Sequence, residues 1–355
     1  MRVWTLVVLL AMGCSDSGGT FNNQVLDNNQ NTTNNTNTTG SNNIATNNTA
    51  TNNIATNNAT PDMGMQPDAA QDMGVDQGPP PDPLEGVGDA VLVQEGFQFT
   101  EGPKWFPDEG VLRFTDIPAN TIFELGTDGT ITSYRNPSGQ ANGLAFDASG
   151  ALLAAEHENR RVSITVDGQP TTLVDRYNGQ RLNSPNDLVL RSDGVIYFTD
   201  PPYGLGNRQR EVAFNGLYRY VPTTQALTAE YEGDANATRP NGVTLSPDEN
   251  TLYMADTQAG KVYQYTVAPD GALSDRLEFA DVSGPDGMAI DVWGNLYVTA
   301  SSGVEVFAPD GIKLGTINVG RQPANCAFGG ADGKTLYITA RQGLYKVELP
   351  VQGVY

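Results

Sequence analysis

The stretch NGVTLSPDENTLYMAD, residues 241–256, opens with an asparagine, runs through a short apolar segment, turns at a Pro-Asp-Glu-Asn cluster and leaves on a second apolar segment. Two short apolar runs on either side of such a cluster predict a β-hairpin. Five further stretches follow the same plan, and each opens with an oxygen-bearing side chain. These six residues, the openers, are Glu101, Asn142, Asn186, Asn241, Asp286 and Asn325.

The spacing of the hairpins predicts how many strands each repeat contains. Every hairpin closes 14 or 15 positions after its opener, and successive closing residues are 40, 44, 56, 44 and 40 residues apart. That distance holds four antiparallel strands. We therefore predict an all-β domain over residues 85–355, a six-bladed β-propeller. The last blade has three strands of its own in the sequence, so we expect Ala90–Gln94 to supply the fourth and close the ring.

The first 84 residues differ from the rest in composition. Arg2 followed by the apolar run Val3–Met12 resembles a secretory leader, and Cys14 stands where bacterial lipoproteins carry their acylated cysteine. We predict a signal peptide over residues 1–14, lipid attachment at Cys14, and a disordered polar tether over residues 15–84. The protein would then be secreted across the inner membrane of a bacterium and lipid-anchored in the cell envelope. A cleaved leader with an incidental cysteine is the alternative.

Charge and cysteine content exclude some classes of function. One of the 20 basic and seven of the 41 acidic residues lie before Glu85, which leaves 19 basic and 34 acidic residues in the predicted domain. This acidic excess argues against nucleic acid as a partner, and no obligate protein partner is evident. The excess serves solubility, and it also suits a cation site. Cys326, in an apolar run, is predicted to be a small core residue.

The openers share a chemistry as well as a position. The innermost strand of each propeller blade lines the central channel, so the six openers are expected around one mouth of that channel. All six offer side-chain oxygens, and none is His or Cys. Such a set favours one hard divalent cation, Ca²⁺ first, with Mg²⁺, Mn²⁺ or Zn²⁺ behind it. The alternative is that these side chains only satisfy backbone donors in tight turns, which explains Glu101 poorly.

At the openers the sequence resembles the gluconolactonase/regucalcin family, which includes senescence marker protein and luciferin-regenerating enzymes, and it is most similar to bacterial gluconolactonases. The resemblance covers about residues 94–347. It rests on Glu101-Gly-Pro-x-Trp105, Ser184-Pro-Asn186-Asp187, Pro240-Asn241-Gly-Val-x-Leu-Ser-Pro-Asp248 and Pro285-Asp286-Gly-Met288. It implies one metal held by Glu101, Asn186, Asn241 and Asp286, with Asn142 and Asn325 beside the site.

The resemblance also implies a reaction, the hydrolysis of a sugar lactone such as gluconolactone. Asp286 is then the expected general base or nucleophile, and Asn186 is expected to touch both metal and substrate. A related esterase or phosphotriesterase, another lactonase, or a non-catalytic calcium-binding propeller remain alternatives. His157, Arg181 and Tyr203 are the further substrate-binding candidates, together with Asn142. For His157, a rim residue hydrogen-bonded to a neighbour is the competing interpretation.

The closing residues complete the set of candidates. Asp116, Asp200 and Asp256 end the second strands of their hairpins. We expect these three carboxylates to bond turn backbone rather than substrate.

Overall fold

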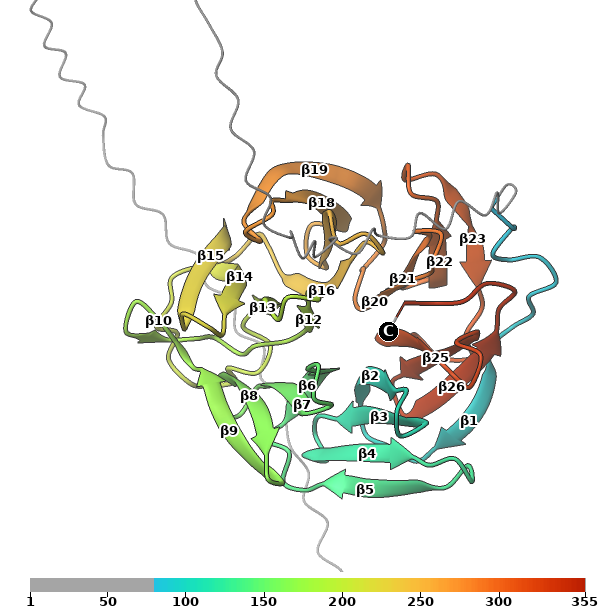
Figure 1. Ribbon diagram of the computed structural model, residues 1–355, viewed down its shortest axis with the longest axis horizontal. Coiled ribbons are helices and arrows are strands. Elements are labelled where there is room, and N and C mark those ends of the chain that lie inside the picture. Colours follow the sequence, from blue (N-terminus) through green and yellow to red (C-terminus); the bar gives the residue numbers. More distant parts are fainter. Residues whose placement is uncertain (1–79, 355) are drawn as a thin grey trace, which may run out of the picture. The chain divides into compact units, whose positions relative to one another are not determined.

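A computed structural model describes residues 80–354, and it confirms the predicted all-β, six-bladed propeller (Figure 1). Each blade is a four-stranded antiparallel sheet, and the described residues contain no helix. The inner strands are β2 (Thr100–Phe106), β6 (Ala141–Phe146), β12 (Leu188–Leu190), β16 (Pro240–Leu245), β20 (Met288–Ile290) and β24 (Asn325–Gly329). The second strands are β3 (Val111–Asp116), β7 (Leu152–Glu156), β13 (Ile196–Asp200), β17 (Thr251–Asp256), β21 (Leu296–Ala300) and β25 (Thr335–Ala340).

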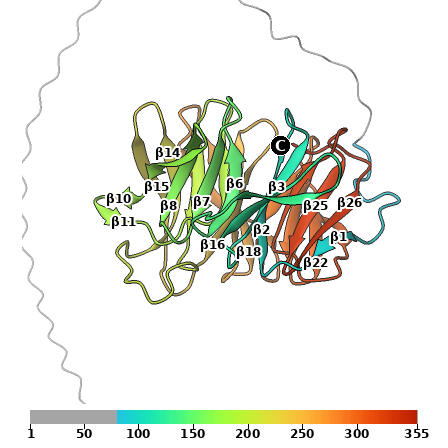
Figure 2. The same cartoon turned by 90° about the horizontal axis from the view of Figure 1, so that it is seen from below.

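The outer half of each blade follows in sequence order. The third strands are β4 (Thr121–Leu125), β8 (Arg161–Val166), β14 (Asn215–Val221), β18 (Lys261–Val267), β22 (Gly303–Phe307) and β26 (Gly343–Glu348). The outermost strands are β5 (Ile131–Arg135), β9 (Gln169–Val174), β15 (Ala226–Gly233), β19 (Leu273–Asp281), β23 (Lys313–Ile317) and β1 (Val91–Glu95). One extra hairpin, β10 (Arg176–Tyr177) with β11 (Gln180–Arg181), projects at the rim between the second and third blades (Figure 2).

The N-terminal strand closes the ring, as predicted. β1 pairs antiparallel with β26, and the last blade has the order β1-β26-β25-β24. The inner strand β24 contacts β2, so the sixth blade lies against the first. The donor strand runs one residue later than expected, Val91–Glu95 instead of Ala90–Gln94. Sealing the last blade with the first strand leaves no open gap in the ring.

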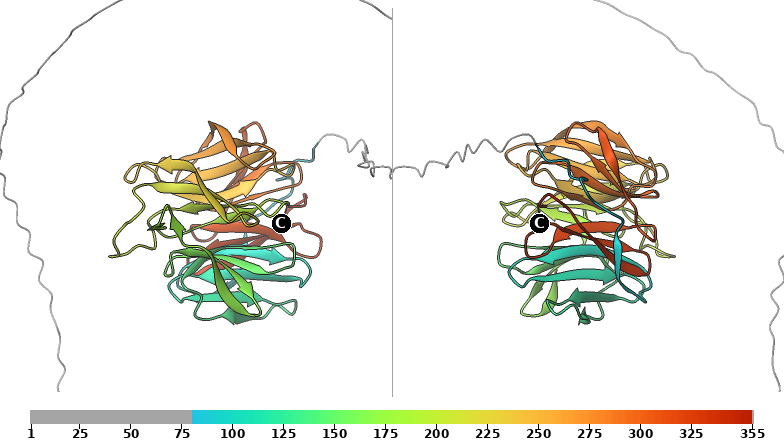
Figure 3. Two further views of the ribbon diagram at one scale, coloured as in Figure 1. Left: turned by 60° about the vertical axis from the view of Figure 1, so that its left-hand side comes forward. Right: turned by 90° about the vertical axis from the view of Figure 1, so that its right-hand side faces the viewer.

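The apolar core lies between blades, because every blade is covered on both faces by its neighbours (Figure 3). Ile196 and Phe198 on β13 pack towards the second blade, where they meet Leu153. Tyr197 between them packs towards the fourth blade against Met254. Successive side chains of a strand point to opposite faces, so burial on both faces explains why these strands carry few polar positions.

The predicted N-terminal segments lie almost wholly outside the described residues. The signal peptide, Cys14 and residues 15–79 of the predicted tether are not among them. The last tether residues are described, and there Leu84 packs against the core of the last blades. Within residues 80–354, no helix is long and apolar enough to cross a membrane.

Candidate functional site

The inner strands stand so close together that the residue after four of the openers has to be glycine. Gly242 N donates to Asp286 O at 3.2 Å, and a Cβ on Gly242 would lie 2.3 Å from that same oxygen. A Cβ on Gly102 would lie 1.9 Å from Asn142 O. Backbone atoms cannot yield at such distances, so the glycines let the openers converge around the channel.

Three of the inner strands, β2, β6 and β16, also depart from regular pairing where their openers lie. The register of β16 against β17 shifts between Pro240 and Val243, which bracket Asn241. The register of β6 against β7 shifts around Asn142 in the same way. A bulge re-aims a side chain that regular pairing would send sideways into a neighbouring blade.

A chain of hydrogen bonds shows that three of the openers meet. Asn142 Nδ2 donates to Asn186 Oδ1 at 2.7 Å, and Asn186 Nδ2 donates to Asn241 Oδ1 at 2.6 Å. These three side chains are buried, and Asp286 keeps part of its surface exposed. Asn142 Oδ1 is buried and receives no hydrogen bond from the part of the chain that the structure describes. A buried oxygen with no partner is available to a bound cation or to substrate.

Two carboxyl groups approach each other at this mouth, and no cationic side chain among residues 80–354 is bonded to either. Burial, followed by the charge of Asp286, raises the pKa of Glu101 well above its usual range. Burial, followed by the charge of Asp187, raises the pKa of Asp286 to about 7. Desolvation and like charge both oppose ionisation. A bound divalent cation would reverse both effects, because its own charge dominates the local electrostatics.

The donor set fits a hard cation. Among residues 80–354 no three His, Cys, Asp or Glu side chains converge, so the candidate site consists of two carboxylates and amides. Carboxylate and amide oxygens are the ligands that Ca²⁺ takes, whereas structural zinc sites use His and Cys.

The aspartates at the ends of the second strands hold the backbone that leads to the openers, as predicted. Asp200 accepts from Asn183 N and Ser184 N, both at 2.7 Å, just before Asn186. Asp116 accepts from Gln98 N and Phe99 N just before Glu101, and Asp256 accepts from Arg239 N just before Asn241. All three aspartates are buried. A carboxylate shared between successive amides fixes a loop that no strand pairing holds.

His157 lies against an opener. Its Nε2 is 3.1 Å from Asn186 Oδ1, and its side chain is 5% exposed. Burial lowers the pKa of His157 to about 4, so the imidazole is neutral at neutral pH. Arg208, which the sequence did not point to, donates to the carbonyl oxygen of His157 at 2.9 Å. That bond fixes the turn that carries the histidine.

The other two loop candidates lie in different surroundings. Tyr203 as a whole residue is 46% exposed, and burial of its phenol, with the nearby charge of Asp286 as a smaller cause, raises the pKa of this group. Arg181 lies on β11, where its Nη2 donates to Asn159 O at 2.6 Å. Its guanidinium is thus bonded to a neighbouring loop and to none of the openers. The substrate roles of both residues stay predictions.

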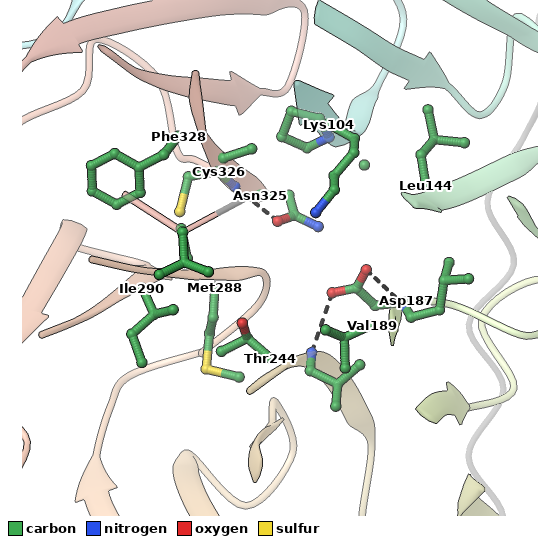
Figure 4. Close-up of a pocket in the computed structure, with 17 residues that line it drawn as sticks. Lys104, Leu144, Asp187, Val189, Thr244, Met288, Ile290, Asn325, Cys326 and Phe328 are labelled. Carbon is green, nitrogen blue, oxygen red and sulfur yellow. Dashed lines mark hydrogen bonds between the residues drawn. The ribbon is translucent and has the colours of Figure 1, made fainter. Parts of the chain in front are cut away.

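Below the openers the channel contains a small chamber that the sequence did not predict. Figure 4 shows Lys104 and Asn325 on one side of it and Asp187 on the other. The cavity measures about 70 Å³. Asp187 accepts from Leu188 N at 3.0 Å and from Val243 N at 3.2 Å, and burial raises its pKa to about 6. Cys326 lines the same cavity and belongs to the core, as predicted.

Comparisons with known proteins agree with this architecture. A model of the SMP-30/Gluconolactonase/LRE-like region matches residues 99–342. A gluconolactonase from Zymomonas mobilis is 35% identical over 295 residues, which cover 74% of this chain and 82% of that protein. A pentonolactonase from Haloferax volcanii is 28% identical, covering 71% of this chain and 84% of that protein.

Solved structures extend the likeness. A gluconolactonase from Xanthomonas campestris has a TM-score of 0.69 and 36% identity, covering 74% of this chain and 91% of that chain. A calcium-binding regucalcin from Agrobacterium tumefaciens has a TM-score of 0.64, covering 76% and 96%, and at 19% identity it shares the fold alone. The family model covers most of the propeller, and the Zymomonas mobilis gluconolactonase is 35% identical. The chain therefore belongs to the SMP-30/gluconolactonase/LRE-like family.

Proposed function

We propose that this protein is a metal-dependent lactonase that opens a sugar lactone, gluconolactone or a close analogue, to the aldonic acid. The observation that carries the proposal is the pair of carboxyl groups, Glu101 and Asp286, which converge with amide oxygens at one channel mouth. The gluconolactonase and pentonolactonase relatives support the substrate class.

Four side chains would hold the cation. Glu101 and Asp286 supply charge, and Asn186 and Asn241 supply amide oxygens from neighbouring blades. Ca²⁺ suits this all-oxygen set best. When bound, the cation would polarise the lactone carbonyl and lower the pKa of a water molecule.

The chain's own residues would handle the proton and the orientation of the substrate. Asp286 is partly exposed at the mouth, so it is placed to take a proton from the attacking water. The water oxygen bonds to the carbonyl carbon, the bond from that carbon to the ring oxygen breaks, and the released oxygen takes up the proton. Neutral His157 and Asn142 lie beside Asn186, where they would hydrogen-bond sugar hydroxyls.

The direct test is hydrolysis of glucono-1,5-lactone by the full chain, followed with a pH indicator and corrected for spontaneous opening. We expect EDTA to abolish activity and one divalent cation to restore it. Glu101→Gln should lower kcat/KM by at least about 100-fold, because it removes a charged ligand. Glu305 is a buried glutamate on β22 that accepts a hydrogen bond from Ser302, and Glu305→Gln should leave kcat/KM unchanged.

Two results would contradict this proposal. Activity that survives both EDTA and Glu101→Gln would refute metal dependence. Cation binding without turnover of any sugar lactone would favour another ester substrate or a non-catalytic calcium-binding propeller.

The cellular location forms a separate part of the proposal. We propose that Cys14 is acylated and anchors the propeller in the bacterial cell envelope through residues 15–84, on the sequence pattern alone. Cys14→Ser should move the protein from the membrane to the soluble fraction of expressing cells. A variant that stays in the membrane fraction would refute the lipid anchor.

A further inference from the structure

One hydroxyl group ends the chain of amides that runs through the proposed metal ligands. Asn241 Nδ2 donates to Thr257 Oγ1 at 2.9 Å, and Thr257 Oγ1 donates to Pro285 O at 2.7 Å. The preceding bonds run from Asn142 to Asn186 and from Asn186 to Asn241. Four side chains and one carbonyl therefore form a single line along one side of the mouth, from the second blade to the fifth.

The direction of this line follows from the last bond. A backbone carbonyl only accepts, so Thr257 has to give its single proton to Pro285 O. The threonine oxygen then only accepts, and Asn241 has to face it with the amide nitrogen. The oxygen of Asn241 consequently points towards Asn186 and the channel. This conclusion does not depend on how the nitrogen and oxygen of either amide are assigned.

We propose that Thr257 is a positioning residue that aims the amide oxygens of Asn241 and Asn186 at the bound cation. The inference rests on the proposed function, because it needs a cation at the openers. Without the hydroxyl, the amide nitrogen of Asn241 loses its acceptor at Thr257, and one of the bonds that hold this nitrogen away from Asn186 is gone. A rotated amide would present its NH₂ group to the cation and to the NH₂ group of Asn186, and both contacts are repulsive.

Thr257→Val keeps the shape of the side chain and removes only the hydroxyl, and Thr257→Ser restores the hydroxyl. Thr121 provides a matched control within the same chain. Its hydroxyl donates to Ala119 O at 2.9 Å and accepts from Asn136 Nδ2 at 2.7 Å, so its bonding is the same. Thr121 begins β4, a third strand that does not line the channel.

The experiment measures Ca²⁺ affinity by titration calorimetry on the EDTA-stripped full chain, with turnover as a second readout. We expect Thr257→Val to weaken Ca²⁺ binding about 10- to 100-fold, the range for partners that orient metal ligands. Saturating Ca²⁺ should restore most of kcat. Thr257→Ser and Thr121→Val should bind Ca²⁺ like the wild type.

Each other outcome has a defined meaning. Wild-type affinity in Thr257→Val would overturn the inference, and so would equal losses in Thr257→Val and Thr257→Ser, which would point to packing. If Thr257→Val does not fold, Thr257→Ala compared with Thr257→Ser decides the same question. A wild-type chain that binds no divalent cation would refute the proposed metal site itself, and the inference with it.

Discussion

Replacing Asp286 by asparagine should stabilise the metal-free protein at alkaline pH while abolishing its response to metal. Burial raises the pKa of this carboxyl from 3.8 to about 7. An acid whose pKa is higher in the folded state gives stability that is complete below the unfolded pKa and lost as pH rises through the folded pKa. Asparagine has no proton to lose, so the variant escapes that loss.

The magnitude follows from the width of this window. A shift from 3.8 to about 7 corresponds to about 4 kcal/mol in full, of which about 3 kcal/mol falls between pH 5 and pH 8. Partial exposure of Asp286 screens its charge, so this value is an upper figure. In a domain of this size it corresponds to a shift in Tm of about 6–12 °C between the two proteins.

The assay is thermal unfolding of both proteins from pH 5 to pH 8, in EDTA and in Ca²⁺. In EDTA, the Tm of the variant relative to the wild type should rise with pH. Ca²⁺ should raise the Tm of the wild type and leave the variant unmoved, because only the wild type binds it tightly. Asp310→Asn, an exposed turn residue, should track the wild type. If the difference in Tm between Asp286→Asn and the wild type stays constant from pH 5 to pH 8 in EDTA, the electrostatic argument is refuted.

Two further predictions concern the framework. Asp200→Asn should lower the free energy of unfolding by about 3 kcal/mol, because the buried carboxylate accepts two backbone hydrogen bonds, and it should also weaken Ca²⁺ binding. Asp291 is a buried turn aspartate on the fifth blade. Asp291→Asn should lower the free energy of unfolding but leave the Ca²⁺ affinity measured by calorimetry unchanged. Gly242→Ala should lower the free energy of unfolding by about 3 kcal/mol or more, because its Cβ would lie 2.3 Å from Asp286 O. Gly88 has open space around it, so Gly88→Ala should unfold in urea like the wild type. Equal Ca²⁺ affinity in Asp200→Asn and Asp291→Asn, or equal urea midpoints for the two glycine variants, would contradict these arguments.

The fold could be predicted because each blade repeats the same local sequence pattern. Each hairpin is specified by an opener, an apolar run, a turn cluster and a second apolar run. Six such hairpins in series can bury both faces of every sheet when the sheets close into a ring. The third strands, such as Thr121–Leu125 and Arg161–Val166, follow the hairpins in sequence order. Ring closure by β1 followed from counting strands in the last blade.

The openers could be placed at one mouth for the same reason, since equivalent positions of a ring meet at its axis. Thr257 and Arg208 could not be found in this way. Thr257 donates to the backbone carbonyl of Pro285, and Arg208 donates to that of His157. Any residue type supplies a backbone carbonyl, so the sequence pattern does not predict such bonds. The guanidinium of Arg181 is bonded to Asn159 O, and its role in substrate binding stays a prediction.

The chamber below the openers follows from the two places where the repeat of glycine after an opener is broken. Glycine follows the opener in the first, second, fourth and fifth blades, where a neighbouring strand leaves no room for a Cβ. Asp187 and Cys326 stand at that position in the third and sixth blades, which lie opposite each other in the ring. Both side chains line the cavity. A departure from glycine after an opener therefore predicts a side chain in the wall of this chamber: Asp187 accepts there from Val243 N, and Cys326 packs into the core that contains Tyr297.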